Sequence, residues 1–116
     1  MESSVATIKM RFEAFLNNDP FAIYNLYSEN SDFRLLFPTF DDYLERFMDR
    51  YAKSIPIKLE IIKVNEKSNL SQILYEERFI DIDEGEVIYY TKTSLKRENN
   101  NWKIIKEQRE KRVREG

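Results

Sequence analysis

The chain contains no histidine and no cysteine. The missing cysteine excludes disulfides, thiolate catalysis and zinc-finger sites, and the missing histidine removes the most common general base and metal ligand. The only glycines, Gly85 and Gly116, cannot form a phosphate-binding loop or a dinucleotide-binding motif. We therefore exclude nucleotide-loop enzymes, and we expect neither a metal site nor a cofactor.

Long apolar runs and a strong charge of one sign are also missing. The net charge is -2, which gives no general attraction to nucleic acid or to anionic membranes. No apolar run approaches the ~20 residues that span a bilayer, and the amino terminus does not resemble a secretory signal. The 116 residues, 41% of them hydrophobic, suit one globular domain over residues 1–116. We expect a cytoplasmic protein that binds neither nucleic acid nor membrane.

Three helices are predicted in the first half of the chain. The first follows a cap at Ser3 or Ser4 and carries an apolar stripe at spacings of three and four residues. The stripe consists of Val5, Ile8, Phe12, Phe15 and Leu16. The second helix is predicted to begin at Asp19, which suits an N-cap, and Pro20, which suits the first helical position.

The third predicted helix begins at Thr39 and Asp42, which resemble a capping box, and its apolar positions extend to Tyr51. The preceding segment, 28–37, is predicted to be irregular, although its apolar residues indicate that it covers part of the core.

The adjacent acids Asp41 and Asp42 suggest a hard-cation site at first sight. Capping and the helix dipole explain them better, because carboxylates favour the first turn of a helix.

The second half of the chain predicts four strands joined by short turns. Ile57, Leu59 and Ile61 alternate with charged residues, and similar patterns cover about 70–80 and 86–97. A fourth strand follows the polar turn 98–101. Its charged tail contains good helix formers, yet a strand is favoured because Trp102 and Ile104 share one face by alternation. We interpret the lysines and arginines of this tail as a solvated face, and the whole half as an antiparallel meander.

Two segments carry a resemblance to a known superfamily. Phe12-Glu13-Ala14-Phe15-Leu16-Asn17-Asn18-Asp19-Pro20 and Asn101-Trp102-Lys103-Ile104-Ile105 are similar to the first helical corner and the final strand of the nuclear transport factor 2-like superfamily. The resemblance implies an α+β fold, the cystatin-like cone, in which three N-terminal helices pack in the concavity of a curved, mainly antiparallel four-stranded sheet. Members include ketosteroid isomerases, polyketide cyclases of the SnoaL type, dehydratases and dimers without known activity, so this fold does not define one function.

Glu77, Tyr75 and Tyr89 are the candidate catalytic residues. Alternation along the second strand places Glu77 on one face with Ile73, Tyr75 and Phe79. If this face looks into the cone, Glu77 would be removed from water and suited to general acid or base work, while a tyrosine hydroxyl could polarise a substrate carbonyl. The alternative is a rim position, where Glu77 pairs with a lysine or arginine of a neighbouring strand.

The isomerase pattern itself is not matched. Ketosteroid isomerases place two aspartates in the pocket, whereas Asp81 and Asp83 of this chain lie in a predicted turn. No residue roles are therefore carried over from that family. The absence of histidine also removes the acid-base partner that dehydratase-like members use.

An apolar pocket inside the cone is the preferred functional hypothesis. The resemblance and the aromatic residues together predict that it is lined by Phe12, Phe15, Phe37, Phe47, Tyr75, Tyr89 and Trp102. The first hypothesis is a small domain that binds an apolar ligand there. The alternatives are a cofactor-independent isomerase, cyclase or dehydratase that uses Glu77, and an interaction or scaffold domain whose cone is filled by its own side chains.

Apolar residues occur on both faces of the predicted sheet. Ile61 precedes Ile62, and Val87 precedes Ile88, so each pair exposes one side chain to each face. Helices can cover only one of the two faces. We therefore expect a homodimer in which the outer face is buried against a second copy.

Overall fold

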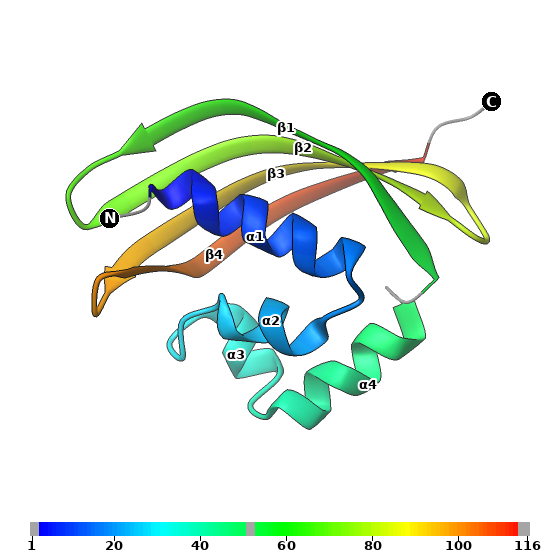
Figure 1. Cartoon of the computed structure of the whole chain (residues 1–116), viewed down its shortest axis with the longest axis horizontal. Helices are drawn as coiled ribbons and strands as arrows, with labels where there is room; N and C mark the ends of the chain where they lie inside the picture. Colours follow the sequence, from blue (N-terminus) through cyan, green and yellow to red (C-terminus); the bar gives the residue numbers. More distant parts are fainter. Residues whose placement is uncertain (1–2, 51–52, 114–116) are drawn as a thin grey trace.

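The computed structural model describes residues 3–50 and 53–113, which form a helical layer under an arched sheet (Figure 1). The four helices are α1 (Ser4–Leu16), α2 (Pro20–Asn25), α3 (Asp32–Leu36) and α4 (Phe40–Arg50). The four strands are β1 (Ser54–Glu66), β2 (Leu70–Asp81), β3 (Gly85–Glu98) and β4 (Asn101–Val113). The α+β class is confirmed, with one more helix than the sequence predicted.

The start of α1 is held by a strand residue. Ser3 occupies the N-cap position but makes no side-chain cap bond. Instead, the Ser4 backbone N–H and the Ser4 hydroxyl donate to Glu66 Oε1 at 2.7 and 2.5 Å. The predicted serine cap is therefore wrong in its chemistry, because a carboxylate from the end of β1 satisfies the helix terminus.

The apolar stripe of α1 also differs from the predicted one. Leu16 is 50% exposed, whereas Arg11 is buried at 1% beside Ile8 and Phe15. Arg11 lies three residues after Ile8 and four before Phe15, so helix geometry turns it to the same face. The sheet-facing side of α1 thus contains a charged residue.

The other predicted caps are present. Ala22 N donates to Asp19 Oδ1 at 3.1 Å, and Pro20 opens α2. Asp42 N donates to Thr39 Oγ1 at 3.3 Å, while the Thr39 hydroxyl donates to Asp42 Oδ2 at 2.9 Å. The predicted end of this helix at Tyr51 lies outside the described residues.

The segment that was predicted to be irregular contains α3. Its N-cap is Ser31, whose hydroxyl oxygen accepts from Arg34 N at 3.1 Å. Five helical residues show too little periodicity for a sequence pattern to distinguish them from an apolar loop. The prediction that this segment covers the core agrees with Phe33, which packs against the core residues.

The sheet is an antiparallel meander in the order β1-β2-β3-β4. Gly85, with φ 78, closes the turn between β2 and β3, and Asn99 and Asn100, with φ 50 and 67, close the turn between β3 and β4. β1 begins at Ser54, earlier than predicted, and contains irregularities in pairing on both sides of Leu59. The tail forms the strand that was predicted in preference to a helix.

The helices cover one face of the arched sheet, and the core lies between the two layers (Figure 1). Phe15 of α1 stacks on Phe47 of α4 and meets Phe79 of β2 edge to face, with ring centroids 6.4 and 5.7 Å away.

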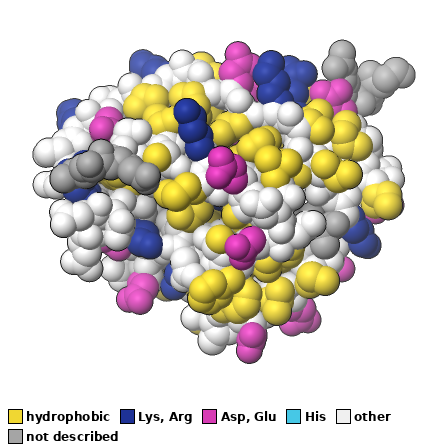
Figure 2. Space-filling model, viewed as in Figure 1, with side chains coloured by type: hydrophobic (Ala, Val, Ile, Leu, Met, Phe, Trp, Pro, Cys, Tyr) yellow, Lys and Arg dark blue, Asp and Glu magenta, His cyan; other side chains and the backbone are white. Residues whose placement is uncertain are grey.

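Figure 2 shows hydrophobic side chains that remain at the surface in patches between charged ones. No helix within the described ranges is long and apolar enough to cross a membrane.

Candidate functional site: a buried ion-pair network

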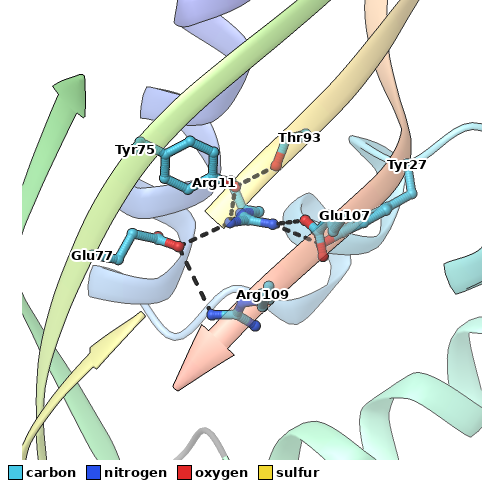
Figure 3. A network of polar contacts seen from close by, with 7 residues as sticks. All are labelled: Arg11, Tyr27, Tyr75, Glu77, Thr93, Glu107 and Arg109. Carbon is cyan, nitrogen blue, oxygen red and sulfur yellow. Dashed lines mark hydrogen bonds and ion pairs between the residues drawn. The ribbon is translucent and has the colours of Figure 1, made fainter. Parts of the chain in front are cut away.

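Four charged side chains meet between α1 and the inner face of the sheet (Figure 3). Arg11 comes from α1, Glu77 from β2, and Glu107 and Arg109 from β4. Glu77 therefore lies on the face that looks into the cone, which was one of the two predicted alternatives. Its exposed fraction is 0%, so the charge needs a partner within the protein.

Arg11 is that partner. Its Nη2 lies 2.9 Å from Glu77 Oε1 and donates to the Tyr75 hydroxyl at 2.7 Å. The same hydroxyl lies 2.7 Å from Thr93 Oγ1. One guanidinium nitrogen thus links the two residues of β2 that the sequence proposed for catalysis.

The other end of the guanidinium faces Glu107. Arg11 Nη1 contacts Glu107 Oε1 and donates to the Tyr27 hydroxyl at 2.8 Å. The Tyr27 hydroxyl in turn donates to Glu107 Oε1 at 2.7 Å. Arg109 completes the network, with its Nη2 3.8 Å from Glu77 Oε1 and its guanidinium carbon 4.1 Å from the centre of the Tyr89 ring.

Burial and charge act together on the protonation of this network. Burial alone would lower the pKa of Arg11, but Glu107, Tyr27, Tyr75 and Glu77 hold this pKa well above its usual value. Burial raises the pKa of Tyr27 and Tyr75, although Arg11 opposes the rise. Arg11 therefore stays charged and both phenols stay protonated, which allows Tyr27 to act as a donor to Glu107.

The arrangement limits what Glu77 can do chemically. Oε1 is occupied by Arg11, and Oε2 is buried without a hydrogen bond to any residue in the described ranges. A general base has to reach a substrate proton at about 3 Å. Neither Glu77 nor Arg11 lines any of five surface hollows of about 200–730 Å³ in the described chain.

The predicted pocket residues divide into two groups. Phe15, Phe47, Tyr75 and Trp102 are buried in the core. Phe12, Phe37 and Tyr89 are half-buried. Tyr89 lines a surface hollow of about 350 Å³ whose other lining residues are almost all charged. Phe37 and Tyr75 border two other hollows, so these three predicted residues line three different hollows instead of one pocket.

Sequence reasoning missed Arg11 and Glu107. The interpretation of the charged tail as a solvated face is wrong for Arg109, whose guanidinium lies against Glu77 and the Tyr89 ring. The spacing of Arg11 within the apolar stripe was a usable signal. The β4 residues were harder to place, because the pairing of β3 with β4 shifts between Ser94 and Leu95. Trp102 and Ile104 point inward, so strict alternation along β4 would turn the even-numbered residues inward throughout. After the shift the odd-numbered Glu107 points inward instead, so alternation counted from Trp102 gives the wrong face.

The same described residues contain no cluster of three or more acidic side chains arranged to hold a metal ion. Asp42 instead makes the capping bonds described above. The chemistry available in the cone is thus that of ion pairs, phenols and one buried carboxylate oxygen.

Comparison with known proteins identifies the fold. No protein-family model matches the chain, and no curated protein resembles it significantly in sequence. A nuclear transport factor 2-like protein of unknown function from Shewanella oneidensis is 13% identical, with a TM-score of 0.71, over 90% of this chain and 93% of the other. A protein of unknown function with a cystatin-like fold from Nostoc punctiforme is 7% identical, with the same TM-score, over 93% and 87%.

A third similar structure is a putative calcium/calmodulin-dependent kinase II association domain from Exiguobacterium sibiricum. It is 14% identical to this chain, with a TM-score of 0.62 over 99% of both chains. At such identities the likeness concerns the fold alone. The chain therefore has the nuclear transport factor 2-like, or cystatin-like, fold that its sequence resembled.

Proposed function

We propose that this chain is a homodimeric association domain that uses the sheet face opposite the helices as its binding surface. Two neighbouring rows of side chains cross the four strands on this outer face. The acidic row consists of Glu60, Glu76, Tyr90 and Glu110. The basic row consists of Lys58, Arg78, Ile88 and Arg112. These two rows are the observation that carries the proposal.

Within one copy, each row places like charges on neighbouring strands. Glu60 lies opposite Glu76, and Lys58 lies opposite Arg78. Like charges in such positions are unfavourable. Contacts between the rows offset part of this repulsion, since Arg78 Nε lies 2.7 Å from Glu76 Oε1. The pattern leaves one acidic and one basic band on the outer face, with exposed charges on β1 and β4 and half-buried charges on β2.

A second copy of the chain has the complementary pattern. A two-fold axis that lies between the two sheets and runs across the strands would set the acidic row of each copy over the basic row of the other. Glu76 would then face Arg78 of the other copy, and Tyr90 would face Ile88. Complementary charge of this kind favours one register, and two-fold symmetry closes the assembly at two subunits.

Apolar side chains adjoin the charged rows. Ile62, Leu74 and Tyr90 line a surface hollow of about 620 Å³. Ile62 is 59% exposed and Leu74 is 37% exposed. Apolar surface surrounded by polar residues is typical of a protein interface. The rows lie toward the end of the sheet that carries the β2–β3 turn.

The other two hypotheses receive less support from the geometry. An apolar ligand in the cone would have to displace the contacts between Arg11, Glu77 and Glu107. Catalysis by Glu77 would require a substrate to reach Oε2, which is buried. The filled interior instead favours a domain that acts through its surface, and the kinase association domain gives a precedent for such a role on a similar fold.

The oligomeric state of the purified protein tests this proposal. Sedimentation equilibrium at micromolar concentration should give twice the 14.1 kDa mass of the chain. Arg78→Glu should weaken the dimer by about tenfold or more, because it sets like charges against each other across the interface. A wild-type protein that remains monomeric over this concentration range would disprove the proposal.

A charge-swapped variant provides the matched control. Glu76→Arg combined with Arg78→Glu keeps the pair within each copy and also restores opposite charges between copies. We expect this double variant to dimerise again. If it remains as weak as Arg78→Glu alone, then the two rows do not face each other.

A further inference from the structure

A second surface hollow lies at the end of the outer face, next to the β1–β2 and β3–β4 turns. Its volume is about 380 Å³, at the lower end of the range for small-molecule sites. Leu70 and Ile105 supply its apolar side chains, and Asn65, Gln72 and Ser94 supply polar groups, whereas the side chain of Leu95 is buried in the core. These residues come from all four strands. We call this hollow the end groove.

Lysines surround the end groove. Lys67 lines it directly. Lys96 is the cross-strand neighbour of Leu70, and Lys106 is the cross-strand neighbour of Ser94. None of the three forms an ion pair with any residue in the described ranges. No acidic side chain lines the groove.

The nearest carboxylates along the chain are engaged elsewhere. Glu66 precedes Lys67 but accepts from Ser4 at the start of α1. Glu98 follows Lys96 by two residues but accepts from the Ser28 hydroxyl at 2.7 Å. Both acids thus bond to the helical side, and Glu107, which follows Lys106, contacts Arg11 inside the cone. The carboxylates that adjoin these lysines along the chain therefore have partners away from the groove. A positive rim around an apolar floor attracts a ligand with one anionic end and one apolar end.

We infer that the end groove binds a small, single-chain amphipathic anion, such as a short aliphatic carboxylate. The apolar chain lies against Leu70 and Ile105, and the carboxylate lies among the ammonium groups of Lys67, Lys96 and Lys106. The groove lies beyond the two charged rows of the proposed dimer, so this inference does not depend on dimerisation. Neither the cone nor the Arg11 network takes part.

Three probes with different chemistry test the inference on the full chain. Sodium octanoate should cause saturable amide shifts in NMR spectra at Leu70, Gln72, Ser94 and Ile105. Acetate lacks the chain and octyltrimethylammonium lacks the negative charge, so both should bind at least about tenfold more weakly. Equal binding of either control probe, or octanoate shifts centred on another part of the molecule, would overturn the inference.

Charge reversal at the rim gives the second test. The rim variant, Lys96→Glu combined with Lys106→Glu, reverses the charge of two lysines beside the groove and should weaken octanoate binding about tenfold. Lys9→Glu combined with Arg46→Glu makes the same change in net charge on exposed helical positions and should leave binding unchanged. Equal losses in both double variants would show a general charge effect and would overturn the site. The comparison of probes on the wild-type chain decides the question if the rim variant fails to fold.

An anionic membrane surface also combines negative charge with apolar chains, so the third experiment measures binding to vesicles. Flotation with vesicles of phosphatidylcholine and phosphatidylserine should leave the protein unbound. Vesicle binding that the rim variant abolishes, together with no saturable octanoate binding, would assign the lysines to a lipid surface and overturn the inference.

Discussion

Arg11 is the residue on which the interior of the cone most depends. It is buried at 1% and bonds to two carboxylates and two phenols. Removal of one partner from a buried ion pair is costly because the other charge stays in a poorly solvating environment. Arg11 would thereby act mainly on stability, not on catalysis.

We predict that Arg11→Met lowers the free energy of unfolding by about 3–5 kcal/mol. Urea denaturation monitored by circular dichroism measures this change. Lys111→Met, at an exposed ion pair with Glu84 that lies outside the two charged rows, serves as the control and should cost less than about 1 kcal/mol. A loss at Arg11 as small as that of the control would show that the network is open to water.

A double variant separates the pair from its surroundings. Arg11→Met with Glu77→Leu should cost less than the sum of the two single changes, because it removes both charges instead of leaving one unpaired. Double-mutant-cycle analysis of the urea data gives the coupling. Additive losses would show that Arg11 and Glu77 do not interact in solution.

At the scale of single elements, α1 depends on a residue far away in sequence. Hydrogen bonds from the Ser4 side chain and backbone lower the pKa of Glu66 from its usual range. The folded state therefore binds the ionised carboxylate more tightly than the unfolded state does. This contribution to the free energy of unfolding is fully present above the pKa that Glu66 has in the unfolded chain. It is lost as the pH falls through the lower pKa that Glu66 has in the folded chain.

We predict that Glu66→Gln removes this part of the pH dependence. Glu66 is exposed, so solvent limits the effect to less than about 1 kcal/mol at neutral pH. Unfolding free energies measured near pH 7 and below about pH 4 should differ less in the variant than in the wild type. An unchanged pH dependence would exclude Glu66 as the cap of α1 in solution.

The elements also show what local sequence information can predict. Asp19 and Thr39 make bonds within one helical turn, so short spacing was enough to identify both caps. Glu66 and Ser4 are 62 residues apart, and no local pattern relates them. The inward position of Glu107 depends on a pairing shift, which a single strand does not reveal. Local elements were therefore predictable, whereas the charged site required the tertiary arrangement.

At the scale of the whole molecule, the proposed dimer links stability to protein concentration. A partner that binds only the folded chain raises the melting temperature as concentration rises, by mass action. We predict such a rise for the wild type and a nearly constant melting temperature for Arg78→Glu, measured by calorimetry over two orders of magnitude. A constant value for both proteins would contradict the proposed association.

The edges of the sheet have a consequence for any such assembly. β1 carries Pro56, two breaks in its pairing and charged side chains at Lys58 and Lys63, all of which hinder the addition of a further strand. The opposite edge is partly occupied, because Ile104 exchanges backbone hydrogen bonds with Leu26 and Ser28. The molecule thus resists fibril growth from strand to strand, even though its broad outer face remains open to contact.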